Sequence, residues 1–399
     1  MNISRRLNQV PASPIRKLVP LADAAKKRGT HVIHLNIGDP DIETPRVMTD
    51  RLRQWQGGIP YAHSQGDAEL IAALLKYYRG LGADYLKAEN IQVTVGGSEA
   101  LTMAMAAVAD PGEEILVFEP FFPSYHSLAV VQGLKVVPVT TSIADGFHLP
   151  KLEQFEALVT PKTRAILLTN PNNPTGTVYR REEVDGLVEL VRRKGLFLLA
   201  DEVYREIVFD GQPSTSLLSY LKVEPDRLVI LDSLSKRYSA PGLRLGMMVS
   251  LNQDLMAGGL RIAMARLSAG YIDQKAAAGL SQVSQADLAA VRDEHQRRRD
   301  VVFAGLKSIK GVTIHQPEGA FYCVVGLPVA EAERFCAWLL SDFSYHGATV
   351  MLAPMAGFYL TPGLGKQEVR WAYVVGETKL KQAIEIIGKA LATYPESRY

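Results

Sequence analysis

Short runs of apolar residues recur through the middle of the chain, and segments with helical spacing of apolar positions separate them. The apolar runs predict strands at residues 90–95, 114–118, 135–139, 164–169, 196–200, 227–232 and 246–250. The intervening pattern predicts helices that include 98–109 and 181–195. Short, fully apolar strands that alternate with helices are typical of an α/β fold with a mainly parallel sheet covered on both faces. Pro138 lacks a backbone donor, so we expect its strand at a sheet edge.

The two ends of the chain follow a different pattern. An N-terminal arm containing Pro11 and Pro14 leads into a short helix that Gly29 closes. A long amphipathic helix at 285–309 precedes two further apolar strands and a closing helix, which predicts a separate α+β layer. We expect three parts: an arm with part of a small domain at 1–45, a large domain at 46–285, and the small C-terminal domain at 286–399.

Composition narrows the class of protein without identifying its chemistry. Hydrophobic residues make up 47% of the 399 residues and charged residues 22%, which excludes a disordered, collagen-like or coiled-coil chain. With 44 basic and 42 acidic residues the net charge is +2, which indicates no nucleic-acid partner. Cys323 and Cys336 have no neighbouring Cys or His pair, so we expect neither a disulfide framework nor a metal site.

No apolar run reaches the length of a membrane span. The longest uncharged stretch, 120–134, is interrupted by Pro123 and His126. The N-terminal residues carry basic side chains but no apolar signal segment. We therefore expect a cytoplasmic protein without a membrane partner.

Polar residues that follow the predicted strands are the first candidates for a functional site. Ligands of parallel sheets bind beyond the carboxyl ends of the strands. Five segments occupy such positions: GGSEA (96–100), EPFFPSY (119–125), NPNNPTG (170–176), DEVY (201–204) and SLSKRYSAPGLRLG (233–246).

Each segment alone also has an ordinary interpretation. Ser98 is a good helix N-cap, and Asp201 could be the N-cap of a helix that follows its strand. NPNNPTG consists of residues common in turns. Lys236 would usually be solvated, and Phe122 would usually be part of the core. The five segments gain meaning only in combination.

The chain resembles the pyridoxal-phosphate-dependent aminotransferases of fold type I, class I/II. The resemblance is carried by NPxNPTG, DEVY and SLSK in this order, with Arg244 eight residues after the lysine of SLSK. The resemblance runs from IGDPDIETP (37–45) to VRWAYVV (369–375) and is nearest to the bacterial aspartate aminotransferase-like branch. It implies a large cofactor-binding domain on a mainly parallel seven-stranded sheet, a smaller α+β domain formed by both chain ends, and a homodimer with shared active sites.

The resemblance also implies roles around the cofactor ring. Lys236 would hold pyridoxal phosphate as a Schiff base and move a proton from the substrate α-carbon. Asp201 would pair with the ring nitrogen and keep it protonated. Asn173 and Tyr204 would bond the phenolic oxygen of the ring, and Phe122 would stack on its face.

Further residues are implied at the two ends of the cofactor. Those expected to bind its phosphate are the amides of Gly97, Ser98 and Glu99, the hydroxyls of Ser233 and Ser235, Arg244, and Tyr61 from the neighbouring subunit. Arg370 would bind the substrate α-carboxylate through two parallel hydrogen bonds. Gly38 would leave room for that carboxylate, and Asn173 would complete the substrate site.

The expected activity is transfer of the amino group of an L-amino acid, aspartate or a broader range, to a 2-oxo acid such as 2-oxoglutarate. A C–S β-lyase or an acyl-CoA-condensing synthase on the same fold is the alternative. A non-enzymatic regulator would need a DNA-binding module before the arm, which the short arm does not provide. A dicarboxylate substrate needs a second cation, for which Arg5, Arg6, Arg16 and Arg237 are candidates. Phe122 and Tyr322 leave an aromatic substrate open as well.

Overall fold

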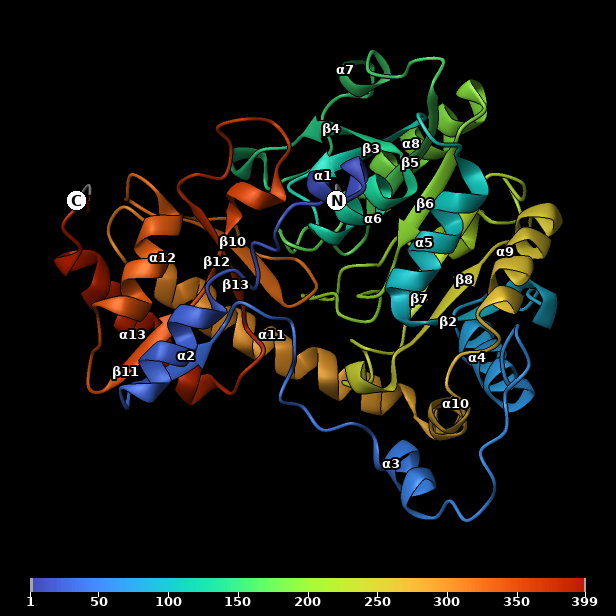
Figure 1. Ribbon diagram of the computed structural model, residues 1–399, viewed down its shortest axis with the longest axis horizontal. Helices are drawn as coiled ribbons and strands as arrows, with labels where there is room; N and C mark the ends of the chain where they lie inside the picture. The colour runs from blue at the N-terminus through green and yellow to red at the C-terminus, as the bar shows by residue number, and fades with distance from the viewer. Residues whose placement is uncertain (1–2, 398–399) are drawn as a thin grey trace.

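The computed structural model describes residues 3–397 and is organised around a seven-stranded sheet. The strands lie in the order β2-β8-β7-β6-β5-β3-β4 (Figure 1). Their bounds are β2 Ile91–Val95, β3 Glu114–Glu119, β4 Lys135–Thr140, β5 Thr163–Thr169, β6 Phe197–Asp201, β7 Leu228–Ser233 and β8 Leu245–Val249. All seven predicted strands are confirmed, each within one residue at either end.

The sheet is mixed but mainly parallel. Strands β7, β6, β5, β3 and β4 pair in parallel, whereas β8 is antiparallel to both β7 and β2. Strand β2 therefore runs in the direction of β7, and six strands end at the same edge. The strand containing Pro138 is β4, which lies at the edge of the sheet as expected.

Helices cover both faces of the large sheet, which explains why its strands are apolar throughout. In β3, Leu116 and Phe118 pack into one core with α4 (Ala68–Gly80) and α8 (Arg181–Lys194). Their neighbours Ile115 and Val117 pack into a second core with the helices on the opposite face, α5 (Gly96–Val108), α6 (Ser124–Gln132) and α9 (Gln253–Ala265). The two-residue period of a strand distributes its side chains between these cores.

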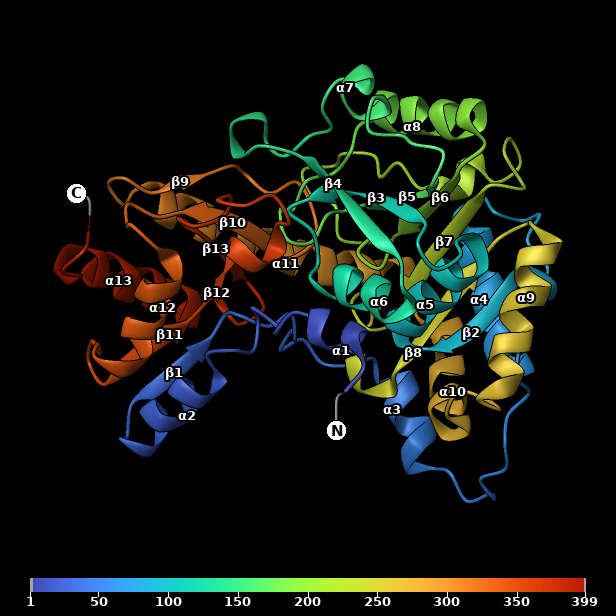
Figure 2. The ribbon, with the colours of Figure 1, turned by 45° about the horizontal axis from the view of Figure 1, so that its top comes forward.

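Both ends of the chain build a second, smaller layer beside the large sheet (Figures 1 and 2). A four-stranded sheet has the order β12-β13-β10-β9, with bounds Ala353–Pro354, Glu368–Ala372, Tyr322–Gly326 and Thr313–Ile314. Strand β1 (His31–His34) pairs in parallel with β11 (Ala348–Met351), so the N-terminal segment is part of this layer. Its core holds Val32, Ile33 and Trp371, but also Tyr204 and Phe209. The domain bounds stay a prediction.

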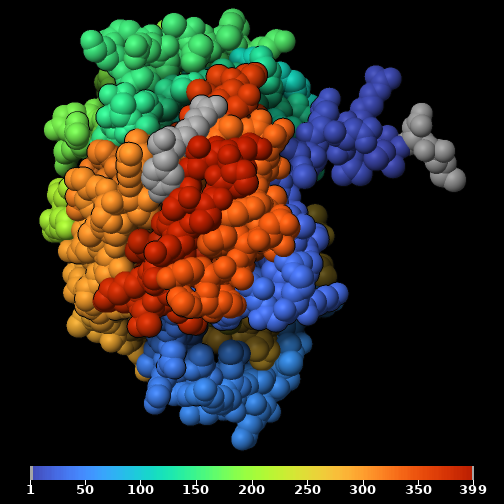
Figure 3. Space-filling model, turned by 90° about the vertical axis from the view of Figure 1, so that its left-hand side faces the viewer, coloured from blue at the N-terminus to red at the C-terminus, as the bar shows by residue number. Residues whose placement is uncertain are grey.

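The remaining helices connect and flank these layers. Their bounds are α1 Arg5–Gln9, α2 Val19–Lys27, α3 Arg46–Arg53, α7 Leu152–Glu156, α10 Tyr271–Ala277, α11 Gln285–Lys307, α12 Ala332–Ser341 and α13 Glu377–Thr393. Helix α1 projects from the body of the molecule (Figure 3). Between residues 3 and 397, the helices are too short or too polar to cross a membrane.

Candidate active site

A cavity of about 630 Å³ lies at the carboxyl ends of the large sheet and also receives residues from the second sheet. Twelve of the fourteen predicted site residues line it: Gly38, Gly97, Ser98, Phe122, Asn173, Asp201, Tyr204, Ser233, Ser235, Lys236, Arg244 and Arg370. Segments far apart in the sequence thus meet at the edge where six strands end.

The centre of the cavity contains an amine and a half-buried carboxylate. Lys236, in the loop after β7, donates from Nζ to the carbonyl oxygen of Gly38 at 2.9 Å. Asp201 is the last residue of β6, and burial raises its pKa to about 6. The hydroxyl of Tyr125 donates to Asp201 Oδ2 at 2.5 Å and opposes that rise. A cation placed beside Asp201 would favour its charged form, so the carboxylate fits a protonated ring nitrogen.

One end of the cavity is built for an anion. Gly97 and Ser98 lie in the first turn of α5, whose N-terminus has no side-chain cap among residues 3–397, so the amides of this turn can bind a ligand. Because its N-cap is Val95, the ordinary interpretation of Ser98 as an N-cap does not hold. Gly96 has φ +73°, and a Cβ there would lie 2.6 Å from Arg244 Nη2.

Hydroxyl groups and a guanidinium complete this end. Ser233 Oγ donates to Ser235 Oγ at 2.7 Å, and both serines line the cavity with Arg244. Backbone amides, hydroxyls and a guanidinium are the donor set that a phosphate group requires. This donor set, together with the amine of Lys236 and the carboxylate of Asp201, fits pyridoxal phosphate.

The opposite end is assembled around a buried guanidinium. Arg370, on β13, is 1% exposed, and burial lowers its pKa. It donates from Nη1 to Asn173 Oδ1 at 2.9 Å and from Nη2 to the carbonyl oxygen of Asn36 at 2.6 Å. Its guanidinium lies over the ring of Tyr322, 4.5 Å from the centroid. The hydrogen bonds and the ring together fix the orientation of the guanidinium.

Two tyrosines and a glycine adjoin Arg370. The hydroxyl of Tyr204 donates to that of Tyr322 at 3.1 Å and accepts from Asn173 Nδ2 at 3.4 Å. Burial raises the pKa of Tyr204 well above its ordinary value, so the hydroxyl keeps its proton. A Cβ on Gly38 would lie 1.7 Å from Tyr322 Oη, so only glycine fits at this position.

Two predicted residues do not line the cavity. The carboxylate of Glu99 accepts a hydrogen bond from the Val95 amide at 2.5 Å and forms an ion pair with Arg266. Tyr61 lies in the segment between α3 and α4 and is 79% exposed. The roles of Glu99 and Tyr61 stay predictions.

Sequence reasoning missed several residues that shape the site. Tyr125 was named only as part of the EPFFPSY segment, although its hydroxyl donates a hydrogen bond to Asp201. Ser13 reaches the cavity from the N-terminal arm, beside Arg16, which was one of the four candidate cations. Asn36 follows β1 and supports Arg370 through its carbonyl oxygen. Only its place in the sequence could have identified Tyr125, because it follows a strand that ends at the edge of the sheet where the site lies.

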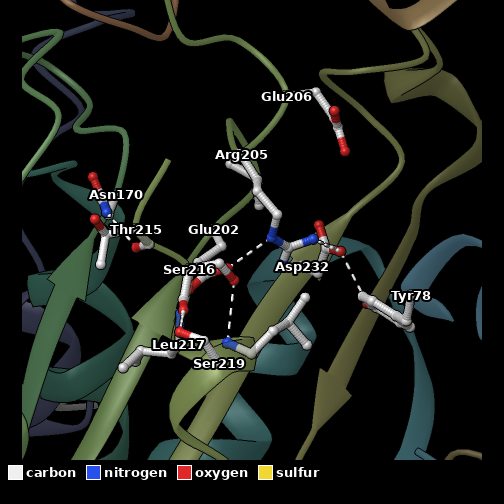
Figure 4. Close-up of polar contacts among 12 residues, drawn as sticks. Tyr78, Asn170, Glu202, Arg205, Glu206, Thr215, Ser216, Leu217, Ser219 and Asp232 are labelled. Carbon is white, nitrogen blue, oxygen red and sulfur yellow. Dashed lines mark hydrogen bonds and ion pairs between the residues drawn. The ribbon is translucent and has the colours of Figure 1, made fainter. Parts of the chain in front are cut away.

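Behind the cavity, a buried ionic network joins the ends of β6 and β7 (Figure 4). Asp232 accepts from Arg237 Nη1 at 2.6 Å, Arg205 Nη1 at 3.1 Å and the Tyr78 hydroxyl at 2.9 Å. Arg205 also donates from Nε to Glu202 at 2.7 Å. Although burial acts to raise it, the guanidinium groups of Arg237 and Arg205 hold the pKa of Asp232 at about 2. Arg237 is therefore not a cation of the substrate site.

Comparison with known proteins decides the family. The model of the family "Aminotransferase class I and II" matches residues 30–386. The chain belongs to this aminotransferase family. Pyridoxal phosphate is therefore its cofactor, and its reaction is amino-group transfer between an amino acid and a 2-oxo acid.

Within the described residues, no group of three or more His, Cys, Asp or Glu is placed to hold a metal ion.

Individual relatives cover almost the whole aminotransferase. Aspartate aminotransferase of Thermotoga maritima is 33% identical over 96% of this chain and 98% of its own. Aromatic-amino-acid aminotransferase 2 of Thermococcus litoralis is 30% identical over 98% of each chain. A crystal structure of the Thermotoga maritima aspartate aminotransferase superposes with a TM-score of 0.88 at 30% identity, covering 98% of this chain and all of the other. These similarities confirm the predicted fold and activity class.

Proposed function

We propose that this aminotransferase carries out both halves of its reaction in the cavity between the two sheets, with Lys236 as the residue that holds the cofactor. The observation that carries the proposal is that Lys236, Asp201 and the phosphate-type donor set line one cavity. When bound, pyridoxal phosphate supplies a carbon that accepts the amino group and a ring that withdraws electrons from the substrate α-carbon.

The residues at the centre would bind the ring and move the proton. Asp201, half-buried at the end of β6, would become a charged partner for the ring nitrogen. Tyr204 and Asn173 would donate to the oxygen on the ring from the position where they now bond each other. Lys236 Nζ would take the proton from the substrate α-carbon as a general base. Phe122 lines the cavity and would cover one face of the ring.

Arg370 would bind the carboxylate that every amino-acid substrate shares. Its guanidinium is buried, oriented by Asn173 and Asn36, and has an Nε without a hydrogen-bond partner among the described residues. A planar guanidinium fork matches a carboxylate through two parallel hydrogen bonds. Gly38 keeps the space beside Tyr322 free of side-chain atoms. Relatives named for aspartate and for aromatic amino acids leave both donor classes to be tested.

We further propose a cytoplasmic homodimer in which Tyr61 reaches the phosphate of the neighbouring subunit. Ile59 and Tyr61 are 72% and 79% exposed, the highest values among the large apolar side chains of the described residues. Both residues lie on the segment between α3 and α4, which extends from the body of the molecule (Figure 1). Cys323 and Cys336 are both free thiols, which fits a reducing compartment. We also propose the domain boundaries predicted from the sequence, which lie between residues 45 and 46 and between residues 285 and 286.

Borohydride reduction followed by peptide mapping tests the role of Lys236. Borohydride makes the bond between the cofactor and its lysine permanent, so the labelled peptide should contain Lys236. Lys236→Ala should lose both the label and turnover. Lys275→Ala is the matched control, because Lys275 pairs with Asp67 outside the cavity, and this variant should keep both. A label on any other lysine would contradict the assignment.

A further inference from the structure

Arg16 brings a further cation to the cavity from the N-terminal arm. The arm turns at this point, because the Arg16 amide donates to the Ser13 carbonyl oxygen at 3.1 Å. The side chain of Asn36 donates from Nδ2 to the carbonyl oxygen of Ile15 at 2.8 Å. The carbonyl oxygen of Asn36 accepts from Arg370 Nη2 at 2.6 Å. One buried residue therefore ties the backbone beside Arg16 to the guanidinium proposed to bind the α-carboxylate.

Packing on both sides of Arg16 fixes this part of the arm. Pro14 is buried, and a Cβ on Gly357 would lie 2.9 Å from its Cβ. Ile15 packs on the cluster that contains Phe358, the ring that lies 5.2 Å from the Arg370 guanidinium. Lys17 forms an ion pair with Glu333 on α12. The arm is anchored before and after Arg16, and Arg16 lines the cavity.

The charges of the cavity leave Arg16 without an assigned partner. Its cations are Arg16, Lys236, Arg244 and Arg370, and its carboxylates are Asp39 and Asp201. The proposed function gives a role to each cation except Arg16. Within residues 3–397, Arg16 forms no ion pair with Asp39 or with any other carboxylate. A guanidinium in a cavity that already binds one carboxylate is placed to attract a second one.

The other candidate cations are accounted for elsewhere. Arg237 is 1% exposed and bound to Asp232 behind the cavity. Arg6 donates from Nη1 to the carbonyl oxygen of Val131 at 3.1 Å. Arg5 lies in α1 and is not among the residues that line the cavity.

We infer that Arg16 binds the distal carboxylate of a dicarboxylic substrate and so selects acidic amino acids and their 2-oxo acids. The inference rests on the proposed function, because it assumes that Arg370 holds the α-carboxylate of the same molecule. Asn36 ties the backbone beside Arg16 to the Arg370 guanidinium, so the two guanidinium groups would hold the two ends of the substrate. Neutral amino acids would bind through Arg370 alone.

Equilibrium binding to the holoenzyme tests this inference without turnover. The probes are succinate, with two carboxylates, and propionate, with one, followed by the change in cofactor absorbance. Arg16→Gln should weaken succinate binding by about 10- to 100-fold, the range expected for one charge-assisted hydrogen-bonded pair. It should weaken propionate binding by less than about threefold. Arg16→Lys should fall between the two enzymes, and Arg5→Gln, the matched arginine of the arm, should behave as wild type.

Single half-reactions, measured without a 2-oxo acid, give a second readout. The rate of the cofactor's absorbance change is compared for aspartate, glutamate and alanine. Arg16→Gln should lower kcat/KM for the two acidic donors by about 10- to 100-fold and for alanine by less than about threefold. Equal losses for all three donors, or no loss for succinate, would overturn the inference while amino-group transfer stands. If no donor reacts with the wild type, the proposed function fails, and the succinate measurement still decides the role of Arg16.

Discussion

At the scale of a single residue, the fold disfavours the negative charge of Asp201, whereas the cofactor ring requires that charge. In the protein without cofactor its carboxylate is half-buried, and its pKa of about 6 lies above the ordinary value of about 3.9. A carboxyl group whose pKa is raised by folding binds more protons in the folded state, so stability falls as pH rises through that interval. The cost is absent below about pH 4 and complete above about pH 6.

Asp201→Asn should therefore stabilise the protein without cofactor. The shift of about two pH units corresponds to about 3 kcal/mol at pH 8, and the difference should vanish near pH 4. Urea unfolding of both proteins at the two pH values measures it, with Asp226→Asn as a surface control. A variant that is less stable than wild type at pH 8 would contradict a costly buried charge.

The same substitution should slow transamination. An amide cannot supply the negative charge that keeps the ring nitrogen protonated. A barrier raised by about 4 kcal/mol corresponds to a rate lower by about a thousandfold. Single-turnover kinetics of the loaded Asp201→Asn enzyme measure this loss, and near-normal rates would remove Asp201 from the ring site.

The residues recovered from sequence are those that the motifs contain. Lys236 and Asp201 follow strands within recognisable segments, so their meeting at the site edge could be predicted from the order of the chain. Tyr125 and Asn36 could not, because each acts through a contact with a residue far away in sequence. Arg16 was one of four equivalent candidates until the packing of the arm placed it on the cavity.

At the scale of elements, the ionic network behind the cavity holds the ends of β6 and β7 together. Glu202 and Arg205 follow β6 directly, and Asp232 and Arg237 flank the segment that contains Lys236. All four side chains are at most 5% exposed, so each charge depends on its partner. Removing one partner of a buried pair leaves the other charge uncompensated.

Arg237→Gln should lower the free energy of unfolding by about 3 kcal/mol, because Asp232 then keeps one guanidinium instead of two. The control is Arg227→Gln, which breaks the partly exposed pair with Glu224 and should cost less than about 1 kcal/mol. Urea unfolding of the two variants provides the comparison. Equal losses would show that burial of the network contributes nothing beyond an ordinary surface pair.

The sequence predicted which segments form strands, but not which strands pair with one another. The apolar runs identified all strands of the large sheet, because burial on both faces leaves an uninterrupted apolar signal. The antiparallel pairing of β8 with β2 leaves no such signal. Strand β1 pairs with β11, and Ala353 of the two-residue strand β12 pairs with Arg370. These contacts depend on how distant segments pack, which local periodicity does not encode.

At the scale of the whole molecule, two parts project from the body and expose apolar side chains. The first is α1 with the residues just before it, which projects from the body in Figure 3. Ile3, before α1, and Leu7, in α1, are 61% and 58% exposed. The second is the segment that carries Ile59 and Tyr61. Exposed apolar side chains on projecting segments favour contact with another chain. A two-fold symmetric dimer would bury both parts and would bring each Tyr61 to the partner's cavity.

Mixing of two defective variants tests whether the sites are shared. Lys236→Ala removes the amine in its own cavity, and Tyr61→Phe removes a hydroxyl donated to the partner's phosphate. In a mixed dimer one site has both defects and the other has neither. Random exchange makes about half of the dimers mixed, so about a quarter of the wild-type activity should return. The assay is run at a cofactor concentration at which Tyr61→Phe alone is largely unloaded, and labelled subunits confirm the exchange. Since sites confined to one chain would stay defective in every combination, exchange without recovered activity would contradict sharing.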